Sequence, residues 1–139
     1  PEELSNLINV EYLYVGHNQL TQLPDINQLV KLQKLHLHYN QLTKLPCMAS
    51  LVNLKELRTN NNLLTTLPAD INHLFKLKKI YIQHNQLTEL PAIGNLGKLR
   101  KIYVSHNRLT VLPDISQLVE LQTLVVDHNQ LTELPDIGN

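Results

Sequence analysis

The sequence predicts an α/β-type repeat solenoid, with a parallel β-sheet on a concave face and short 3₁₀ or turn segments on the convex face. Two observations predict this class. A motif of the form xNxLTxLP occurs six times in the 139 residues, from "HNQLTQLP" at 17–24 to "HNQLTELP" at 128–135. Its asparagines and prolines recur every 22 residues, with a single step of 23. A period that covers the whole chain predicts one repeat domain, residues 1–139.

A short strand is expected before each motif. The pattern LxxLxL places apolar residues at alternate positions, as in Leu35 and Leu37, and so buries one side of a strand. In the third repeat Thr59 replaces a core leucine, and we expect its hydroxyl to bond to the backbone; the alternative is a bend that shapes the outer face. The strand cores are expected near 10–18, 32–40, 54–62, 77–85, 99–107 and 121–129.

The convex segments begin after each Leu-Pro pair, because proline lacks an amide donor and disfavours helix in its predecessor. Few residues remain in each repeat, so 3₁₀ or single-turn structure is expected there. The extra residue of the 23-residue step is Ala69, which indicates a tolerant turn. Four aspartates stand where these segments start and are expected as N-caps: Asp25, Asp70, Asp114 and Asp136.

The motif asparagines are expected to form an internal ladder. An asparagine side chain offers an acceptor and two donors, which can satisfy turn backbone groups that would otherwise be buried unpaired. Each such unpaired group costs about 1 to 3 kcal/mol. The ladder residues are Asn18, Asn40, Asn62, Asn85, Asn107 and Asn129.

The combined pattern LxxLxLxxNxL is the leucine-rich repeat signature. The run "NQLTxLPxxIxxLxxLxxLxLxxN" resembles the leucine-rich repeats of bacterial proteins, in particular those of effectors that intracellular pathogens deliver into eukaryotic cells. The resemblance implies a horseshoe arc whose concave positions carry function. Related families join such repeats to ubiquitin-ligase domains, but the 22-residue period differs from their shorter repeat, so that activity is not carried over.

The outward strand positions are the candidate binding site. All five tyrosines lie there or just before a ladder asparagine, whereas the only phenylalanine, Phe75, does not. Tyrosine also favours strands, so half-buried sheet residues are the alternative interpretation. Tyrosine beside arginine and lysine is typical of protein recognition, and we expect Tyr81 and Tyr103 to stack. The predicted partner-binding residues are Tyr12, Tyr14, Lys34, His36, Tyr39, Arg58, Lys79, Tyr81, Lys101 and Tyr103.

The basic and acidic residues are unevenly distributed over the repeat, although twelve of each give a net charge of zero. The strand positions and the residue before them hold Lys34, Lys55, Arg58, Lys78, Lys79, Arg100 and Lys101, against Glu11, Glu56 and Asp127. This predicts a protein partner with an acidic patch. The neutral total disfavours nucleic acid and a membrane surface, so neither is expected as a partner.

Catalytic and metal sites are not expected, nor is a cofactor. His84, His106 and His128 should form a file about 5 Å apart, but no Cys or carboxylate completes a metal shell except Asp127. Cys47 has no base-like neighbour and is interpreted as an inert thiol. The sequence contains no Gly-rich phosphate loop, HExxH or GxSxG. We therefore expect a module that is not an enzyme.

The predicted function is protein binding by a bacterial effector-like protein that acts on a host protein or regulates another bacterial protein. A substrate-targeting arm of an enzyme and an extracellular adhesin are the alternatives. The single cysteine fits a reducing compartment, such as a host cytosol reached by secretion. Both termini look truncated or uncapped, so self-association through open solenoid ends is also expected.

Overall fold

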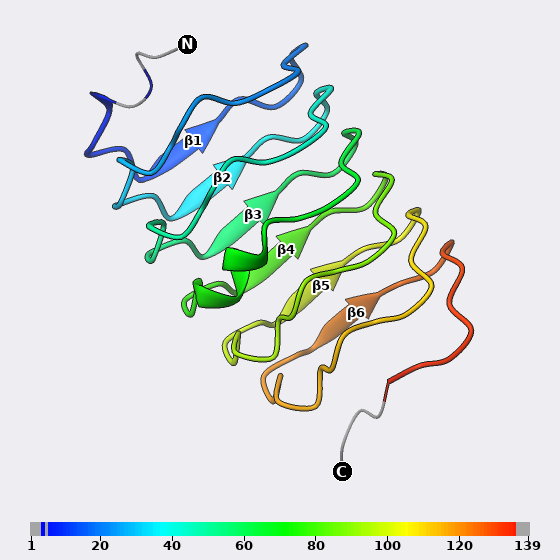
Figure 1. Ribbon diagram of the computed structural model, residues 1–139. Helices are drawn as coiled ribbons and strands as arrows, with labels where there is room; N and C mark the ends of the chain where they lie inside the picture. Colours follow the sequence, from blue (N-terminus) through cyan, green and yellow to red (C-terminus); the bar gives the residue numbers. More distant parts are fainter. Residues whose placement is uncertain (1–3, 5, 136–139) are drawn as a thin grey trace.

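Six parallel strands form one sheet in the order β1-β2-β3-β4-β5-β6 in the computed structural model (Figure 1), which describes residue 4 and residues 6–135. The strands are β1 (Tyr12–Tyr14), β2 (Lys34–His36), β3 (Glu56–Arg58), β4 (Lys79–Tyr81), β5 (Lys101–Tyr103) and β6 (Thr123–Val125). Each strand pairs with the next without a register shift, as in Tyr81 opposite Tyr103. Equivalent residues of successive coils therefore form straight columns, which confirms the predicted solenoid.

Each strand lies within one of the stretches near which a strand core is expected. Each regular strand has three residues, and the middle one is directed toward the core: it is buried in β2 to β5 and partly buried in β1 and β6. Coil-to-coil backbone bonding continues past the strand, as in Val15 N to His36 O at 2.9 Å and His17 N to His38 O at 2.9 Å. The strand ends because the backbone turns into the left-handed region at His17 and its equivalents.

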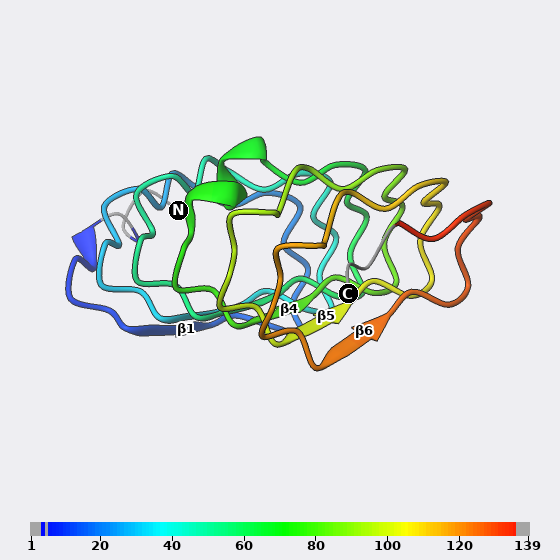
Figure 2. The same ribbon diagram turned by 90° about the horizontal axis from the view of Figure 1, so that it is seen from below.

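The convex side contains turns and the short 3₁₀ helix η2 (Ala69–His73). Figure 2 shows the sheet along one side of the molecule and the turns with η2 along the opposite side. The extra residue, Ala69, is the first residue of η2. In the other coils two successive hydrogen bonds from residue i+3 to residue i replace the helix. The predicted 3₁₀ and turn character is confirmed.

The aspartates divide into two kinds. Asp25 accepts a hydrogen bond from Asn27 N at 2.9 Å, and Asp114 accepts one from Ser116 N at 2.8 Å, so both close local turns. The N-cap expected of Asp70 is wrong, because Pro68 caps η2 and Asp70 lies in the first turn. Its Oδ2 instead accepts from Met48 N, at 3.1 Å, and Cys47 Sγ, at 3.0 Å, in the preceding coil. Asp136 lies outside the described residues.

The core is a single stack of aliphatic columns. Leu32, Leu54, Leu77 and Leu99 have no exposed surface and occupy one position of successive coils. Thr59 interrupts a neighbouring column and is also completely buried. The expectation that its hydroxyl bonds to backbone is wrong, because Oγ1 has no hydrogen-bond partner within the described chain. The Thr59 hydroxyl is thus removed from water without gaining a hydrogen bond in the described part of the protein.

Candidate functional site

The outer surface of the sheet, here called the concave face, carries nine of the ten predicted binding residues on strands β1 to β5. They occupy the first and third positions of each strand, while the middle residue is directed into the core, as Leu57 is. Tyr39 is the tenth and follows β2 in a turn. The side chains of Tyr12, Tyr14 and Tyr39 are each about half exposed, at 53%, 57% and 48%.

A connected row of side chains runs across the concave face from β1 to β5. We name it the central ladder: Tyr14, His36, Glu56, Arg58, Tyr81 and Tyr103. The Tyr14 and His36 rings stack at 4.4 Å, and His36 Nε2 lies 3.0 Å from Glu56 Oε1.

The central ladder continues through an arginine. The Arg58 guanidinium carbon lies 4.3 Å from the centre of the Tyr81 ring, and Tyr81 stacks on Tyr103 at 5.0 Å with an interplanar angle of 12°. The predicted Tyr81–Tyr103 stack is confirmed. Five strands are therefore bridged by direct contacts, which holds these side chains in a fixed arrangement.

Glu56 is also a member of this row; the sequence placed it at a strand position but did not predict it as a site residue. Only 6% of it is exposed, and its Oε1 accepts from Arg58 Nε at 2.6 Å as well as from His36. Burial acts to raise the pKa of this carboxyl, but the hydrogen bond and charge of Arg58, together with His36, lower it overall. Glu56 is therefore ionised and neutralises part of the Arg58 charge.

Two histidines of the second coil, His36 and His38, have lowered pKa values. Burial is the main cause for His36, opposed by the Glu56 charge; for His38, burial is followed by the charges of His17 and Arg58. A neutral His36 donates from Nε2 to Glu56. The His38 ring packs over Gly16, where an added Cβ would lie 2.8 Å from two ring atoms. Glycine at that position therefore makes space for the imidazole.

The position before each ladder asparagine has a positive φ between 54° and 58°. Asparagine and histidine are enriched in this region, which explains why four of the six coils repeat histidine at this position and one has asparagine. The residues are His17, Tyr39, Asn61, His84, His106 and His128. Tyr39 is the bulky exception and stacks on His17 at 4.6 Å.

The predicted histidine file is confirmed. His84 stacks on His106 at 4.3 Å, and His106 on His128 at 4.1 Å. The pKa of His106 is lowered, first by desolvation and then by the two neighbouring imidazoles. Within residues 6–135 no cluster of three His, Cys, Asp or Glu side chains is arranged to hold a metal ion.

The asparagine ladder joins each coil to the one before it. Asn85 Nδ2 donates to Ile82 O, at 3.1 Å, and to Thr59 O of the preceding coil, at 3.0 Å, while its Oδ1 accepts from Leu64 N at 3.0 Å. Asn40, Asn62, Asn107 and Asn129 repeat this arrangement. Asn18 bonds within its own coil, to Val15 O at 2.9 Å. The six amides thus hold the scaffold beneath the concave face.

Sequence profiles agree with this architecture. The profile described as Leucine rich repeat matches residues 76–131, and the profile Leucine Rich repeats (2 copies) matches residues 8–49 and 30–73. The chain belongs to the leucine-rich repeat proteins. Solenoids of this family are typical binding scaffolds whose curvature creates extended binding surfaces. Among curated proteins, none matches the sequence.

Solved bacterial leucine-rich repeat structures are similar to the chain. The leucine-rich effector protein YopM from Yersinia pestis is 35% identical with a TM-score of 0.84, over 91% of this chain and 35% of YopM. A Shigella effector leucine-rich repeat domain is 33% identical with a TM-score of 0.82, over 96% of this chain and 56% of that domain. An internalin from Listeria monocytogenes is 26% identical with a TM-score of 0.81, over 96% of this chain and 43% of the internalin.

The lysines of the concave face are arranged as like-charged neighbours. Lys79 and Lys101 are register partners on β4 and β5, and among the described residues neither forms a salt bridge. Like charges directly opposite on neighbouring strands destabilise a sheet. Lys34 Nζ lies 5.6 Å from the centre of the Tyr12 ring. The repeat fold does not require this repulsion, so a counter-charge from a partner would relieve it.

Proposed function

We propose that this leucine-rich repeat domain is a protein-recognition module that binds its partner on the concave face. The observation that carries the proposal is the central ladder, a row of aromatic and charged side chains that is held by direct contacts from β1 to β5. Preorganised aromatic side chains lose little conformational entropy on binding. Tyrosine and arginine are also the residues most enriched among binding hot spots.

The proposed partner has an acidic patch. Lys34, Lys79 and Lys101 are half-buried cations that flank the central ladder, whereas Arg58 already shares its charge with Glu56. The lysines therefore supply the charge complementarity, and the tyrosines supply contact area. This distribution favours a partner whose carboxylates surround an apolar or aromatic centre.

A capture experiment tests this function. The immobilised domain is exposed to a host-cell lysate, and the proteins retained by wild type and by Tyr81→Ala/Tyr103→Ala are compared. Each truncation should weaken binding by about 1 to 3 kcal/mol if the two rings lie at the centre of the interface. Val111→Ala/Leu134→Ala removes two exposed apolar side chains from outside the concave face and is the control. If both double variants retained the same proteins in the same amounts, the concave face would be excluded as the binding site.

We propose that the parent protein is a bacterial effector secreted into a host cell, where the module engages a host protein or regulates a bacterial one. The similarity to YopM and to the Shigella effector domain supports this proposal. The solenoid has no proposed catalytic role. The Shigella structure is one domain of an effector, so a second candidate function is a targeting arm for an enzymatic domain of the same protein.

A further inference from the structure

A row of protruding turns lies along one edge of the solenoid, just before the strands. In every coil a backbone hydrogen bond closes a four-residue turn, from Val10 N to Leu7 O at 3.1 Å through Leu121 N to Leu118 O at 3.1 Å. The two central residues of each turn form its tip. We name these pairs the turn-tip row: Ile8-Asn9, Val30-Lys31, Val52-Asn53, Phe75-Lys76, Gly97-Lys98 and Val119-Glu120.

The first residue of each tip is an exposed apolar side chain in five of the six coils. The exposed fractions are 53% for Ile8, 43% for Val30, 51% for Val52, 55% for Phe75 and 84% for Val119. None of these side chains belongs to the buried core cluster or to the partly buried residues packed on it. Folding therefore does not account for their apolar character. The only phenylalanine of the chain stands near the middle of this row.

Basic side chains accompany the apolar tips. The second tip position and the residue just before each strand together hold six basic residues and two acidic ones: Lys31, Lys55, Lys76, Lys78, Lys98 and Arg100, against Glu11 and Glu120. The acids are at the two ends of the row, and Glu120 is bonded to Arg100 at 3.2 Å. The neutral total of the chain therefore conceals a positively charged edge.

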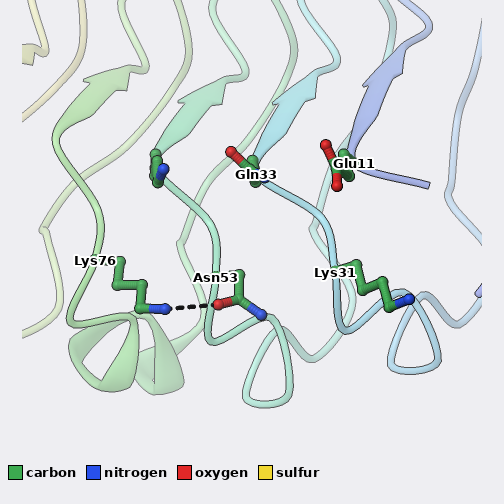
Figure 3. Close-up of a pocket in the computed structure, with 6 residues that line it drawn as sticks. Glu11, Lys31, Gln33, Asn53 and Lys76 are labelled. Atoms are coloured by element: carbon green, nitrogen blue, oxygen red, sulfur yellow. Dashed lines mark hydrogen bonds between the residues drawn. The ribbon is translucent and has the colours of Figure 1, made fainter. Parts of the chain in front are cut away.

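Hydrogen bonds hold part of this edge in place. Lys31 Nζ donates to Asn9 Oδ1 at 2.8 Å, and Lys76 Nζ donates to Asn53 Oδ1 at 2.7 Å, each reaching to the preceding coil. Figure 3 shows Lys31, Asn53 and Lys76 on successive turns beneath the strand starts. A shallow groove of about 310 Å³ between turns and strands is lined by Glu11, Lys31, Gln33, Asn53, Lys55 and Lys76. The lysine ammonium groups are thus aligned along the edge.

We propose that the turn-tip row docks on an anionic membrane surface. With about 5 Å between coils, the six tips form a row roughly 25 Å long on one edge of the solenoid. Its apolar side chains are single and protruding, as in residues that insert between lipid headgroups, and do not form one continuous apolar patch of the kind a protein interface uses. Stable surface binding requires both apolar insertion and basic charge, and the row supplies both.

The docking does not depend on the proposed function, because the turn-tip row and the central ladder use different side chains. The row consists of turn residues that precede the strands, whereas the central ladder lies on the strands. A membrane-docked solenoid would keep its concave face open to a protein partner. An experiment that contradicts membrane docking therefore does not contradict protein recognition on the concave face, and the reverse also holds.

Vesicle sedimentation tests the proposal. The whole chain is mixed with vesicles of equal parts phosphatidylserine and phosphatidylcholine, and separately with vesicles of phosphatidylcholine alone. Binding is expected to the first only, and to weaken as salt is added. Lys76→Gln/Lys98→Gln should lower the partition coefficient about 25-fold, because each basic residue near an anionic leaflet contributes about fivefold. Phe75→Ser should lower it about tenfold through lost apolar insertion.

The matched control is Lys79→Gln/Lys101→Gln, which removes the same charge from the same two coils on the concave face. Its effect should be several-fold smaller, because those lysines lie farther from the bilayer and are screened over about 10 Å. Equal losses with both double variants would assign the binding to bulk charge and overturn the proposal. If the domain were retained on immobilised polyglutamate but did not bind vesicles, the turn-tip row would be assigned to an acidic protein partner. That result would also overturn the membrane proposal.

Discussion

At the residue scale, the clearest link from sequence to structure is the position before each ladder asparagine. Its positive φ explains why histidine and asparagine recur there, and this backbone state could have been expected from those residue types. Tyr39 occupies the same conformation without that preference. Its stack on His17 provides a compensating contact that only the folded coils reveal.

Thr59→Val is expected to stabilise the protein. The hydroxyl of Thr59 is buried without a hydrogen-bond partner in the described chain, and valine has nearly the same shape. Removing the desolvated hydroxyl should raise the free energy of unfolding by about 1 to 2 kcal/mol, as measured by urea denaturation. Thr88→Val, at an exposed position, is the control and should change stability little. A loss of stability in Thr59→Val would show that the hydroxyl is satisfied.

At the scale of the elements, the sequence predicted which residues face outward but not how neighbouring strands connect. Strict register follows from the constant period, so the Tyr81–Tyr103 stack could be predicted. The contact of Glu56 with His36 and Arg58 could not, because it depends on the diagonal reach of three side chains across β2 and β3. The pattern also does not show at which residue each strand ends, because it does not reveal where the backbone turns.

The burial of His36 and His38 and the ionised Glu56 carboxylate make stability depend on pH. His36 and His38 have pKa values lowered from 6.5, chiefly by burial, so the unfolded chain takes up protons first as the pH falls. The free energy of unfolding should therefore be constant well above pH 6.5 and decline as the pH falls through 6.5 toward the lower folded values. Glu56 causes a further decline in the free energy of unfolding at lower pH. This decline begins near 4.5, the ordinary pKa of a glutamate, and continues as the pH falls through the lower pKa of Glu56 in the folded protein.

Urea denaturation across this pH range measures the effect. His36→Gln/His38→Gln should flatten the decline near pH 6.5, because the unfolded chain then has two fewer groups to protonate. His73→Gln removes an exposed histidine of η2 and serves as the control. A wild-type stability that rises on acidification through this range would contradict the assignment of buried, neutral imidazoles.

At the scale of the whole molecule, each repeat contains constant positions that build the scaffold and variable positions that form the surface. The core leucines and ladder asparagines recur in every coil and account for the fold, so the fold could be predicted almost completely from the period. The surface columns vary, and their chemistry becomes visible only when coils are stacked. Net charge concealed the basic edge, since opposite charges distant in space cancel in a sum over the sequence.

The concave face is also distinguishable by its amino acids. Its strands carry four of the five tyrosines, and Tyr39 follows β2, whereas Phe75 lies on the turn-tip row. Hydroxyl-radical footprinting read by mass spectrometry can therefore report on the two surfaces in one sample. Binding of a partner to the central ladder should slow the oxidation of Tyr14, Tyr81 and Tyr103.

Footprinting of the domain bound to its captured partner tests the central claim most directly. The account predicts that the oxidation of Tyr81 and Tyr103 falls several-fold on binding, while that of Phe75 is unchanged. Protection of Phe75 with unaltered tyrosine oxidation would contradict recognition on the concave face.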